Sequence, residues 1–347
     1  MSTAATQVDT VPSSMATGEA AGPMPMTAVA TRLSAICDMI QEHRHTNTPI
    51  SARRAAAIST MIDDVAATAA EGRPRACRLK RRMSSGPAPV DTARHRATGH
   101  PVAVKSLHRR SGRSHVGDVL REACFMAAGG GHPSLAAFRT VARSPGTTDY
   151  SIVMDYVGPS LRTVMGDRVD QPFSEAEVRC VMRQLLVGAE VMHGHGIVHR
   201  DIKLDNILVG DGGAVRICNY GVAKSLAEKA TPSCCFAGTL AYMAPEVLVK
   251  NAEHNTLVDA WSLGCVMAEL LTGKLPFAGK DEANHLFKIF DVLSVPCKRV
   301  WQAMKPQAYD DEVQVWRARQ LRVRHRSRLR ELFPEEMLSR DGFQVLK

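Results

Sequence analysis

One short string of residues has the types and spacing that phosphoryl transfer needs. Positions 199–206 read H-R-D-I-K-L-D-N. In such a reaction a carboxylate orients the attacking hydroxyl and takes its proton, a role that suits Asp201. A nearby cation offsets the charge on the transferred group, which suits Lys203, and Asn206 supplies a neutral oxygen for a metal ion. The string therefore predicts a catalytic loop centred on Asp201.

A lysine and a glutamate upstream of this string have the order expected of a pair that positions a nucleotide. The β-type run at 102–104 ends at Lys105, whose ammonium group can reach the α- and β-phosphates. Glu122 follows in a segment with helical spacing, 118–128, at a separation that suits an ion pair with Lys105. The alternative is a surface lysine and a solvated glutamate. Their position before the H-R-D string favours the functional interpretation.

The surrounding pattern indicates which elements hold these residues. A strand-like segment at 150–156 follows the helical one, and from Ser174 onward the chain has mostly helical spacing. Ser174 and Glu177 have the spacing of a capping box at a helix start. A small strand-rich part followed by a larger helical part predicts an α+β enzyme with two lobes.

Two more motifs follow the catalytic string. The segment Gly238–Glu246 ends in A-P-E and closes an activation segment, and Asp259 begins a helix on which that segment can rest. This order of motifs resembles the eukaryotic protein kinase family over about residues 83–347. Six residues at matching positions carry the resemblance: Lys105, Glu122, Asp201, Asn206, Glu246 and Asp259.

The resemblance implies ATP and a protein as substrates, with Mg²⁺ or alternatively Mn²⁺ as the metal. It implies a hinge at 155–157 that bonds adenine through its backbone, with Met154 as gatekeeper. The implied nucleotide-binding residues are Val90, Ala103, Lys105, Glu122, Met154, Asp155, Val157 and Leu208, and the implied metal ligands are Asn206 and Asn219.

The resemblance also implies roles around the activation segment. Thr239, together with Lys203, is typical of the serine/threonine branch of the family. Arg200 implies an activation loop that is ordered by a phosphate. Where the cyclin-dependent branch has a phosphorylated threonine, this chain has Cys234 or Cys235, which leaves two candidate sites: Thr231 and Ser233.

Three further residues take structural roles by the same resemblance: His199, Arg200 and Asp259. Glu246 usually pairs with an arginine of a late helix in the family. The chain stops at Lys347, before the last helices of the kinase fold, so we expect a truncated large lobe in which Glu246 lacks that arginine.

Within the family, the chain most resembles cyclin-dependent kinases, and especially the divergent cyclin-dependent kinase F-like proteins of grasses. The similarity lies in residues 121–125, 131–135 and 286–293, with Pro296 and Trp301. A cyclin is a possible partner by the resemblance, but no motif indicates one, because the helix with Glu122 lacks a PSTAIRE-type sequence. Met243 replaces the arginine that accompanies proline-directed selectivity.

Two departures weaken the expected activity. The metal-binding D-F-G is here Asn219-Tyr220-Gly221, and an asparagine offers a neutral oxygen where an aspartate offers an anionic one. The glycine-rich loop is replaced by residues 83–90, with Met83, Ser85 and Ala88 where glycines are expected. Its two prolines remove N–H donors and stiffen the turn, so we expect a weak hold on the phosphates.

The composition places few limits on this interpretation. The 347 residues carry a net charge of +9, but the basic residues form local clusters, so we expect solvated surfaces rather than a nucleic-acid site. The nine cysteines are scattered and odd in number, which indicates reduced thiols. No apolar run is long enough to cross a bilayer, and no secretory signal is visible. We therefore expect a cytoplasmic or nuclear protein without membrane contact.

The predicted organisation has three parts. Residues 1–82 form a disordered or weakly helical basic extension and linker, 83–157 the small lobe with its hinge, and 158–347 a truncated large lobe. Two functions stay open: a slow serine/threonine kinase, or a pseudokinase that acts as a binding or scaffold module. Asp205 could attract a basic residue of a peptide substrate, although an exposed loop acid is the simpler interpretation.

Overall fold

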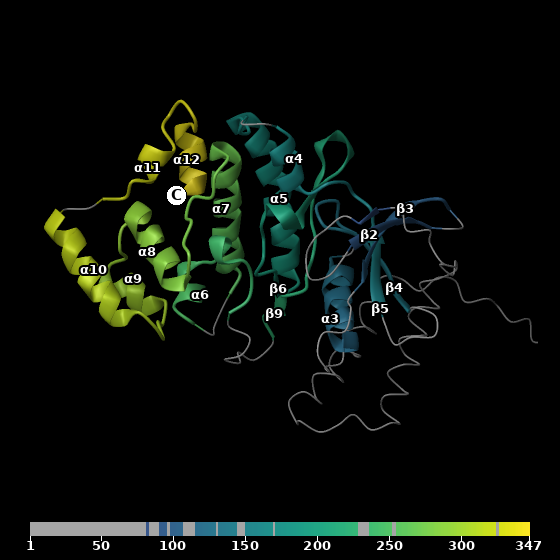
Figure 1. Ribbon diagram of the computed structural model, residues 1–347, viewed down its shortest axis with the longest axis horizontal. Coiled ribbons are helices and arrows are strands. Elements are labelled where there is room, and N and C mark those ends of the chain that lie inside the picture. Colours follow the sequence, from purple (N-terminus) through teal and green to yellow (C-terminus); the bar gives the residue numbers. More distant parts are fainter. Residues whose placement is uncertain are drawn as a thin grey trace, which may run out of the picture.

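The computed structural model describes residues 81–82, 90–95, 98–106, 115–129, 131–143, 150–168, 171–227, 236–251, 255–323 and 326–347. An antiparallel sheet with one long helix comes first along the chain, and a mostly helical part follows, as the α+β prediction requires. Figure 1 shows the sheet and α3 at one end and the helices of the other part beyond them. Most of the predicted extension and all of 83–89, which replaces the glycine-rich loop, lie outside the described residues.

Five strands form the sheet of the small lobe. They are β1 (Arg81–Arg82), β2 (Val90–Arg94), β3 (Pro101–Ser106), β4 (Phe138–Arg143) and β5 (Tyr150–Asp155), in the order β1-β2-β3-β5-β4. The β3 strand is longer than the predicted run 102–104 because it pairs with β2 on one edge and β5 on the other. It holds Lys105 between Val90 and Ile152, in the middle of the sheet.

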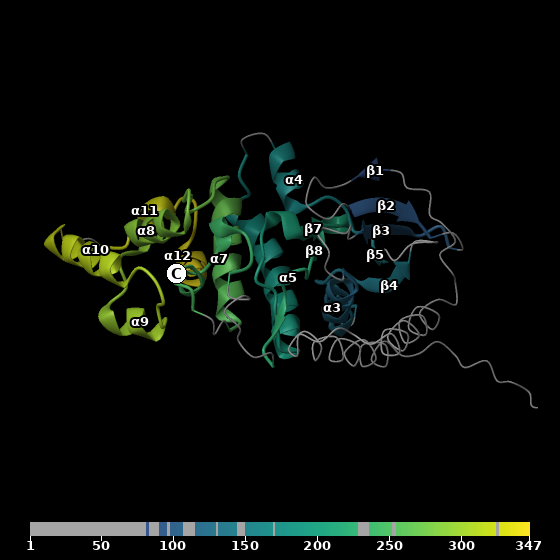
Figure 2. The ribbon, with the colours of Figure 1, turned by 60° about the horizontal axis from the view of Figure 1, so that its bottom comes forward.

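Helix α3 (His115–Ala128) packs against β4 and β5. It contains the predicted helical segment 118–128 and buries Val119, Leu120 and Ala123 completely or almost so. Figure 2 shows α3 alongside the sheet, with β7 (Ile207–Val209) and β8 (Val215–Ile217) on the side of the large lobe that faces it. Leu135, after α3, forms a bridge to Ile217 of β8, which links the two lobes.

The large lobe contains short strands and several helices. Its remaining strands are β6 (Ile197–Val198) and β9 (Lys224–Ser225). Its α-helices are α4 (Leu161–Asp167), α5 (Glu175–Gly194), α6 (Pro245–Leu248), α7 (Leu257–Thr272), α8 (Glu282–Leu293), α9 (Lys298–Ala303), α10 (Asp310–Val323), α11 (Leu329–Leu332) and α12 (Arg340–Leu346). Short 3-10 turns occur at Leu204–Asn206, Asp211–Gly213 and Leu240–Tyr242.

The start of α5 is fixed by the capping box that the sequence predicts. The Ser174 hydroxyl accepts a hydrogen bond from the Glu177 amide at 3.4 Å. The Glu177 carboxylate accepts one from the Ser174 amide at 2.8 Å. These two bonds satisfy helix donors that would otherwise lack partners. Helix α5 then runs through the large lobe and packs against α7.

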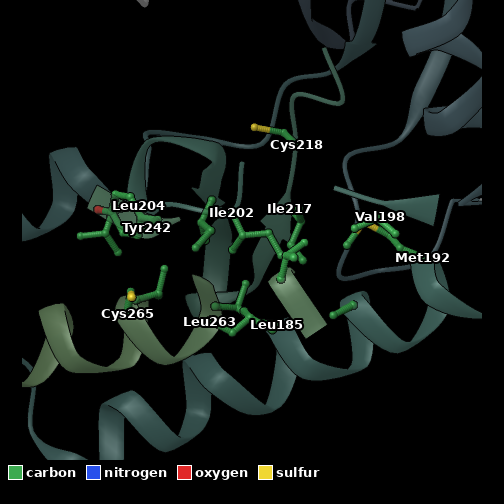
Figure 3. Close-up of a cluster of buried hydrophobic side chains, with 14 of the residues drawn as sticks. Leu185, Met192, Val198, Ile202, Leu204, Ile217, Cys218, Tyr242, Leu263 and Cys265 are labelled. Atoms are coloured by element: carbon green, nitrogen blue, oxygen red, sulfur yellow. The ribbon is translucent and has the colours of Figure 1, made fainter. Parts of the chain in front are cut away.

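The catalytic string rests on a buried apolar cluster between α5 and α7. Ile202 and Leu204 are fully buried, and Figure 3 shows Ile202 near Leu185 of α5 and Leu263 of α7, with Leu204 beside Tyr242. Each buried aliphatic side chain of this kind contributes about 1.5–3 kcal/mol to folding relative to an exposed one. The alternation of apolar and polar residues from Ile202 onward therefore anchors the backbone of the loop while Asp201 and Lys203 stay at its surface.

His285 of α8 gives the large lobe a predicted sensitivity to acid. Its ring is fully buried, Nδ1 accepts a hydrogen bond from the Gly279 amide, and burial lowers its pKa to about 4. In the unfolded chain the His285 ring binds a proton as the pH falls below about 6.5, whereas in the folded chain it stays neutral down to about pH 4. The contribution of the neutral ring to the free energy of unfolding is therefore fully present above pH 6.5 and is lost as the pH falls towards 4. We expect a loss of about 3 kcal/mol in the free energy of unfolding across this window.

Urea unfolding of the wild type and of His285→Asn at pH 7, 6, 5 and 4 measures this contribution. Asparagine keeps an acceptor for Gly279 but does not titrate, so the difference in unfolding free energy between the two proteins should shrink as the pH falls. An unchanged difference across the series would show that His285 is accessible to protons in the folded state.

Candidate active site

Asp201, Lys203 and Thr239 form a compact group at the surface of the catalytic loop. The Thr239 hydroxyl donates to Asp201 Oδ1 at 2.7 Å. Lys203 Nζ lies 3.0 Å from Asp201 Oδ2 and 2.6 Å from Thr239 Oγ1. The side chains of Asp201 and Lys203 are only 11% and 20% exposed, so the charges lie in a partly dry environment where they interact strongly. The arrangement places a carboxylate and an ammonium group together, as transfer to a hydroxyl requires.

Asp259, at the start of α7, holds the backbone of the loop in place. Its fully buried carboxylate accepts hydrogen bonds from the amides of His199 and Arg200, both at 2.8 Å. His193 Nε2 lies 2.9 Å from the same group. Arg200 has a φ of 66°, a conformation that costs energy for a residue of its size and needs such support. The predicted structural residues therefore lie together beneath Asp201.

Replacement of Asp259 by asparagine should cost about 2 kcal/mol of unfolding free energy, because an amide NH₂ then faces a backbone N–H. Urea unfolding measures the loss, and hydrogen exchange at the amides of His199 and Arg200 should become faster. Asp211→Asn, which changes an exposed acid, serves as the control and should stay within about 0.5 kcal/mol of the wild type. Equal stability of the two variants would contradict the assigned role of Asp259.

The predicted pair of Lys105 and Glu122 is present and buried. Lys105 Nζ, at the end of β3, lies 2.6 and 2.7 Å from the two carboxylate oxygens of Glu122 on α3. The side chains are 8% and 2% exposed, respectively. This burial excludes the alternative of a surface lysine and a solvated glutamate. The pair fixes the ammonium group of Lys105, on the central strand β3, within hydrogen-bond distance of Asn219 in the large lobe.

Asn219 connects this pair to the catalytic loop through a series of hydrogen bonds, each of which is donated in the direction from Lys105 to Asp201. Lys105 Nζ donates to Asn219 Oδ1 at 2.7 Å, and Asn219 Nδ2 donates to Asn206 Oδ1 at 2.9 Å. Asn206 Nδ2 in turn donates to the carbonyl and the carboxylate of Asp201 at 2.7 and 2.9 Å. A lysine can only donate, so its contact fixes the orientation of both amides. All four predicted residues thus converge in one site.

The backbone at Asn219 supports the same arrangement. Its φ of 69° lies in the left-handed region, which asparagine adopts more readily than most residues. The neighbouring Cys218 thiol is buried, and burial raises its pKa to about 12, so it is no nucleophile in this state. Tyr220 lies against His199, and its hydroxyl has no partner among the described residues.

The amides of Asn206 and Asn219 do not fit a divalent cation as they stand. Mg²⁺ prefers anionic oxygens and binds through one or two carboxylates. Here the Asn206 oxygen accepts from Asn219, and the Asn219 oxygen lies 2.7 Å from the Lys105 ammonium group, which repels a cation. No group of three or more His, Cys, Asp or Glu side chains in the described part of the chain could hold a metal. A metal at this pair stays a prediction.

The implied adenine contacts lie around the junction of the two lobes. Ala103 and Met154 are buried and directly opposite each other on β3 and β5. Val90 on β2 is half-buried, as is Leu208 on β7, which forms a bridge to Ser160. Val90, Ala103 and Met154 lie on β2, β3 and β5, the strand that carries Lys105 and its two neighbours.

In the hinge, Asp155 uses both its side chain and its amide in contacts within the protein. The Asp155 carboxylate pairs with Arg139 at 2.5 Å, and its amide donates to the carbonyl of Ala137. The Val157 amide donates to no described residue, so it is available to an adenine nitrogen. Gly158 follows, with a φ of 157°, and a Cβ there would lie 2.0 Å from the Val209 carbonyl oxygen. The hinge backbone thus packs directly on the loop after β7.

The activation segment is described at its start, residues 219–227, and near its end, from residue 236 onward. Thr231, Ser233 and both cysteines at 234–235 lie outside the described residues. Gly238 lies so close to the catalytic loop, with a φ of 114°, that a Cβ would come within 2.3 Å of the Arg200 carbonyl oxygen. Arg200 Nε donates to the Val222 carbonyl at 2.8 Å. Burial raises the pKa of Glu246, which has no ion-pair partner in the described ranges.

Sequence motifs missed a second network beside the loop. Arg162 of α4 donates to Glu269 of α7 at 2.6 Å and to the Tyr242 hydroxyl at 2.7 Å, and that hydroxyl also bonds to Glu269. Asp205 lies 3.5 Å from Arg162 and is 54% exposed, which fits an exposed loop acid. Arg162 lies outside every motif, so only its packing reveals the role. The network fixes the turn that follows Thr239.

A comparison with known protein families identifies the family of this chain. The protein kinase domain family matches residues 85–341. The chain belongs to the protein kinase family. This chain is 43% identical over 265 residues to the protein named "Putative cyclin-dependent kinase F-2" of Oryza sativa subsp. japonica. The aligned region covers 74% of this chain and 78% of that protein.

Other relatives are less similar to this chain in sequence and match a smaller share of it. Cyclin-dependent kinase G-2 of Oryza sativa subsp. indica is 35% identical over 213 residues, 61% of this chain and 30% of that protein. Cyclin-dependent kinase G1 of Arabidopsis thaliana is 40% identical over 171 residues, 49% of this chain and 28% of that protein. This chain therefore spans less than a third of the length of each of these two relatives. No helix in the described ranges is long and apolar enough to cross a membrane.

Proposed function

We propose that the chain is an ATP-dependent protein serine/threonine kinase of the cyclin-dependent-kinase-like type that works slowly. The group of Asp201, Lys203 and Thr239 carries this proposal, because it brings a carboxylate, an ammonium group and a hydroxyl together at the H-R-D string of the protein kinase family. ATP and a protein hydroxyl are the substrates. The retained pair of Lys105 and Glu122 supports nucleotide binding.

The residues divide the chemistry as follows. Asp201 orients a serine or threonine hydroxyl and accepts its proton while the hydroxyl oxygen bonds to the γ-phosphorus. The bond from that phosphorus to the bridging oxygen breaks, and ADP leaves. Lys203 offsets charge on the transferred group, and Lys105 holds the α- and β-phosphates. The hinge amide of Val157 bonds the adenine.

A binding or scaffold module is the second candidate, and one contact favours it. The hydrogen bond from Asn219 to Asn206 at 2.9 Å fills the position between the catalytic loop and the small lobe without any ligand. A module of this kind keeps the kinase fold, binds partners through its surfaces and does not transfer phosphate. A cyclin partner has no support from a described contact and stays outside the proposal.

Labelled phosphate from [γ-³²P]ATP separates the two functions. The wild-type chain, Asp201→Ala and the control Asp211→Ala are incubated with a generic protein substrate in Mg²⁺ and in Mn²⁺. A kinase labels the substrate in the wild type and control and loses the label in Asp201→Ala. A wild type that labels nothing under either ion, while it still binds ATP, favours the binding module.

A further inference from the structure

The charged side chains of the candidate active site neutralise one another in pairs. Lys105 Nζ lies 2.6 Å from the carboxylate of Glu122. Lys203 Nζ lies 3.0 Å from the carboxylate of Asp201. Each of these two carboxylates therefore has an ammonium group as its counter-charge. A divalent cation that entered the site would meet carboxylates whose charge is already offset, so it would gain little from them.

Asn219 presents a hydrogen-bond donor where an aspartate would present a negative charge. Its amide oxygen accepts from Lys105 Nζ at 2.7 Å, so its NH₂ group points away from the ammonium group. One hydrogen of this NH₂ group goes to Asn206 Oδ1 at 2.9 Å. The NH₂ group carries a second hydrogen, for which the described ranges hold no acceptor. An NH₂ group can donate to a phosphate oxygen, but it offers no oxygen ligand to Mg²⁺.

The oxygens of the two amides are poor ligands for a divalent cation even when a nucleotide is bound. The Asn206 oxygen is occupied by its bond from Asn219. The Asn219 oxygen becomes free when Lys105 turns one N–H towards a phosphate, but it remains neutral. The strongest ligands for Mg²⁺ in this site would therefore be the phosphates themselves. A cation bound there reduces the negative charge that attracts the two ammonium groups.

We propose that this chain binds ATP in its metal-free form: Lys105 and the NH₂ group of Asn219 hold the phosphates directly, and Mg²⁺ weakens the complex. The net charge of +9 acts in the same direction, because metal-free ATP is more negative than its Mg²⁺ complex. The identity of the nucleotide rests on the proposed function, but the binding itself needs no transfer of phosphate. Asn219 is then a phosphate-binding residue instead of a metal ligand.

Isothermal titration calorimetry of the full chain with ATP tests this, in EDTA and in excess Mg²⁺ at equal ionic strength. We expect ATP to bind roughly threefold to tenfold more tightly in EDTA, which corresponds to a modest charge interaction. Adenosine has no phosphates and should bind equally in the two buffers, so it controls for an effect of Mg²⁺ on the protein itself. This comparison uses the wild type alone and does not depend on whether a variant folds.

Variants at position 219 assign the effect to that residue. Asn219→Asp supplies an anionic oxygen beside Asn206 and should reverse the preference, with ATP bound roughly tenfold more tightly in Mg²⁺ than in EDTA. Asn219→Ala removes the NH₂ donor without adding charge and should weaken binding in EDTA by roughly threefold to tenfold. Asn255→Asp adds the same charge at an exposed position and keeps an acceptor for the Leu257 amide, so it should retain the wild-type preference.

Equal affinity of the wild type in the two buffers, or tighter binding in Mg²⁺, would overturn the proposal, as would an Asn219→Asp variant that still prefers EDTA. The kinase function is tested separately by the transfer of labelled phosphate. A wild type that prefers metal-free ATP but transfers no phosphate keeps this inference and loses the kinase assignment. A wild type that transfers phosphate and binds ATP more tightly with Mg²⁺ keeps the kinase assignment and loses this inference. The absence of ATP binding in both buffers would contradict both.

Discussion

Replacement of Asn219 by aspartate should raise the rate of phosphate transfer in Mg²⁺ by roughly 100-fold to 1,000-fold, equivalent to about 3–4 kcal/mol of transition-state stabilisation. A carboxylate cannot donate to Asn206 Oδ1, so the 2.9 Å hydrogen bond between the two side chains is lost. The new anionic oxygen then faces the freed Asn206 oxygen, which together suit Mg²⁺. Initial rates with [γ-³²P]ATP and a generic protein substrate measure the change.

Two controls separate the effect of charge from the effect of the lost hydrogen bond. Asn219→Ala removes the donor without adding charge and should give little gain in rate. Asn219→Asp combined with Asp201→Ala should be inactive, which shows that the gained activity uses the proposed base. If Asn219→Asp is no faster than the wild type, the metal position is not what limits this chain, and the binding module becomes the better interpretation.

Removal of the Glu122 carboxylate should cost the small lobe about 3–5 kcal/mol, because the Lys105 ammonium group then stays buried without its counter-charge. The pair is buried on both sides, with Nζ 2.6 Å from Oε1. Asn219 Oδ1 still accepts from Lys105, but a neutral oxygen offsets only part of the desolvation. Urea unfolding of Glu122→Ala at pH 7 measures the loss.

A double variant distinguishes a buried charge from a general packing defect. Lys105→Met/Glu122→Leu replaces both partners with apolar groups of similar size and should recover most of the lost stability. Glu331→Ala breaks the exposed pair of Arg328 and Glu331 and should cost less than about 1 kcal/mol. Equal losses for Glu122→Ala and Glu331→Ala would refute the burial argument.

Much of the site could be predicted because its residues follow local spacing rules. The H-R-D string places Asp201, Lys203 and Asn206 within one loop, and the helical spacing of 118–128 places Glu122 on a helix. The capping box at Ser174 was predicted for the same reason, since both of its bonds lie within four residues. Short-range patterns of this kind can be read from the sequence because their partners lie within a few residues.

Contacts between distant positions could not be predicted from such patterns. Arg162 and Glu269 are separated by 107 positions, and no periodicity connects them. The sequence predicts Asn219 as a weak metal ligand, but only the packing against Lys105 and Asn206 shows that its amide is already bonded at both ends.

The chain of bonds from Lys105 through Asn219 and Asn206 to Asp201 has a consequence for how a nucleotide associates. On the proposed function, the phosphates of ATP occupy the region between Lys105 and Asp201. The hydrogen bond from Lys105 to Asn219, which acts as a latch between the lobes, then has to open before they reach it. Opening is a step within the protein and does not depend on ligand concentration. The observed association rate should therefore level off at high ATP, at a ceiling set by the latch rather than by diffusion.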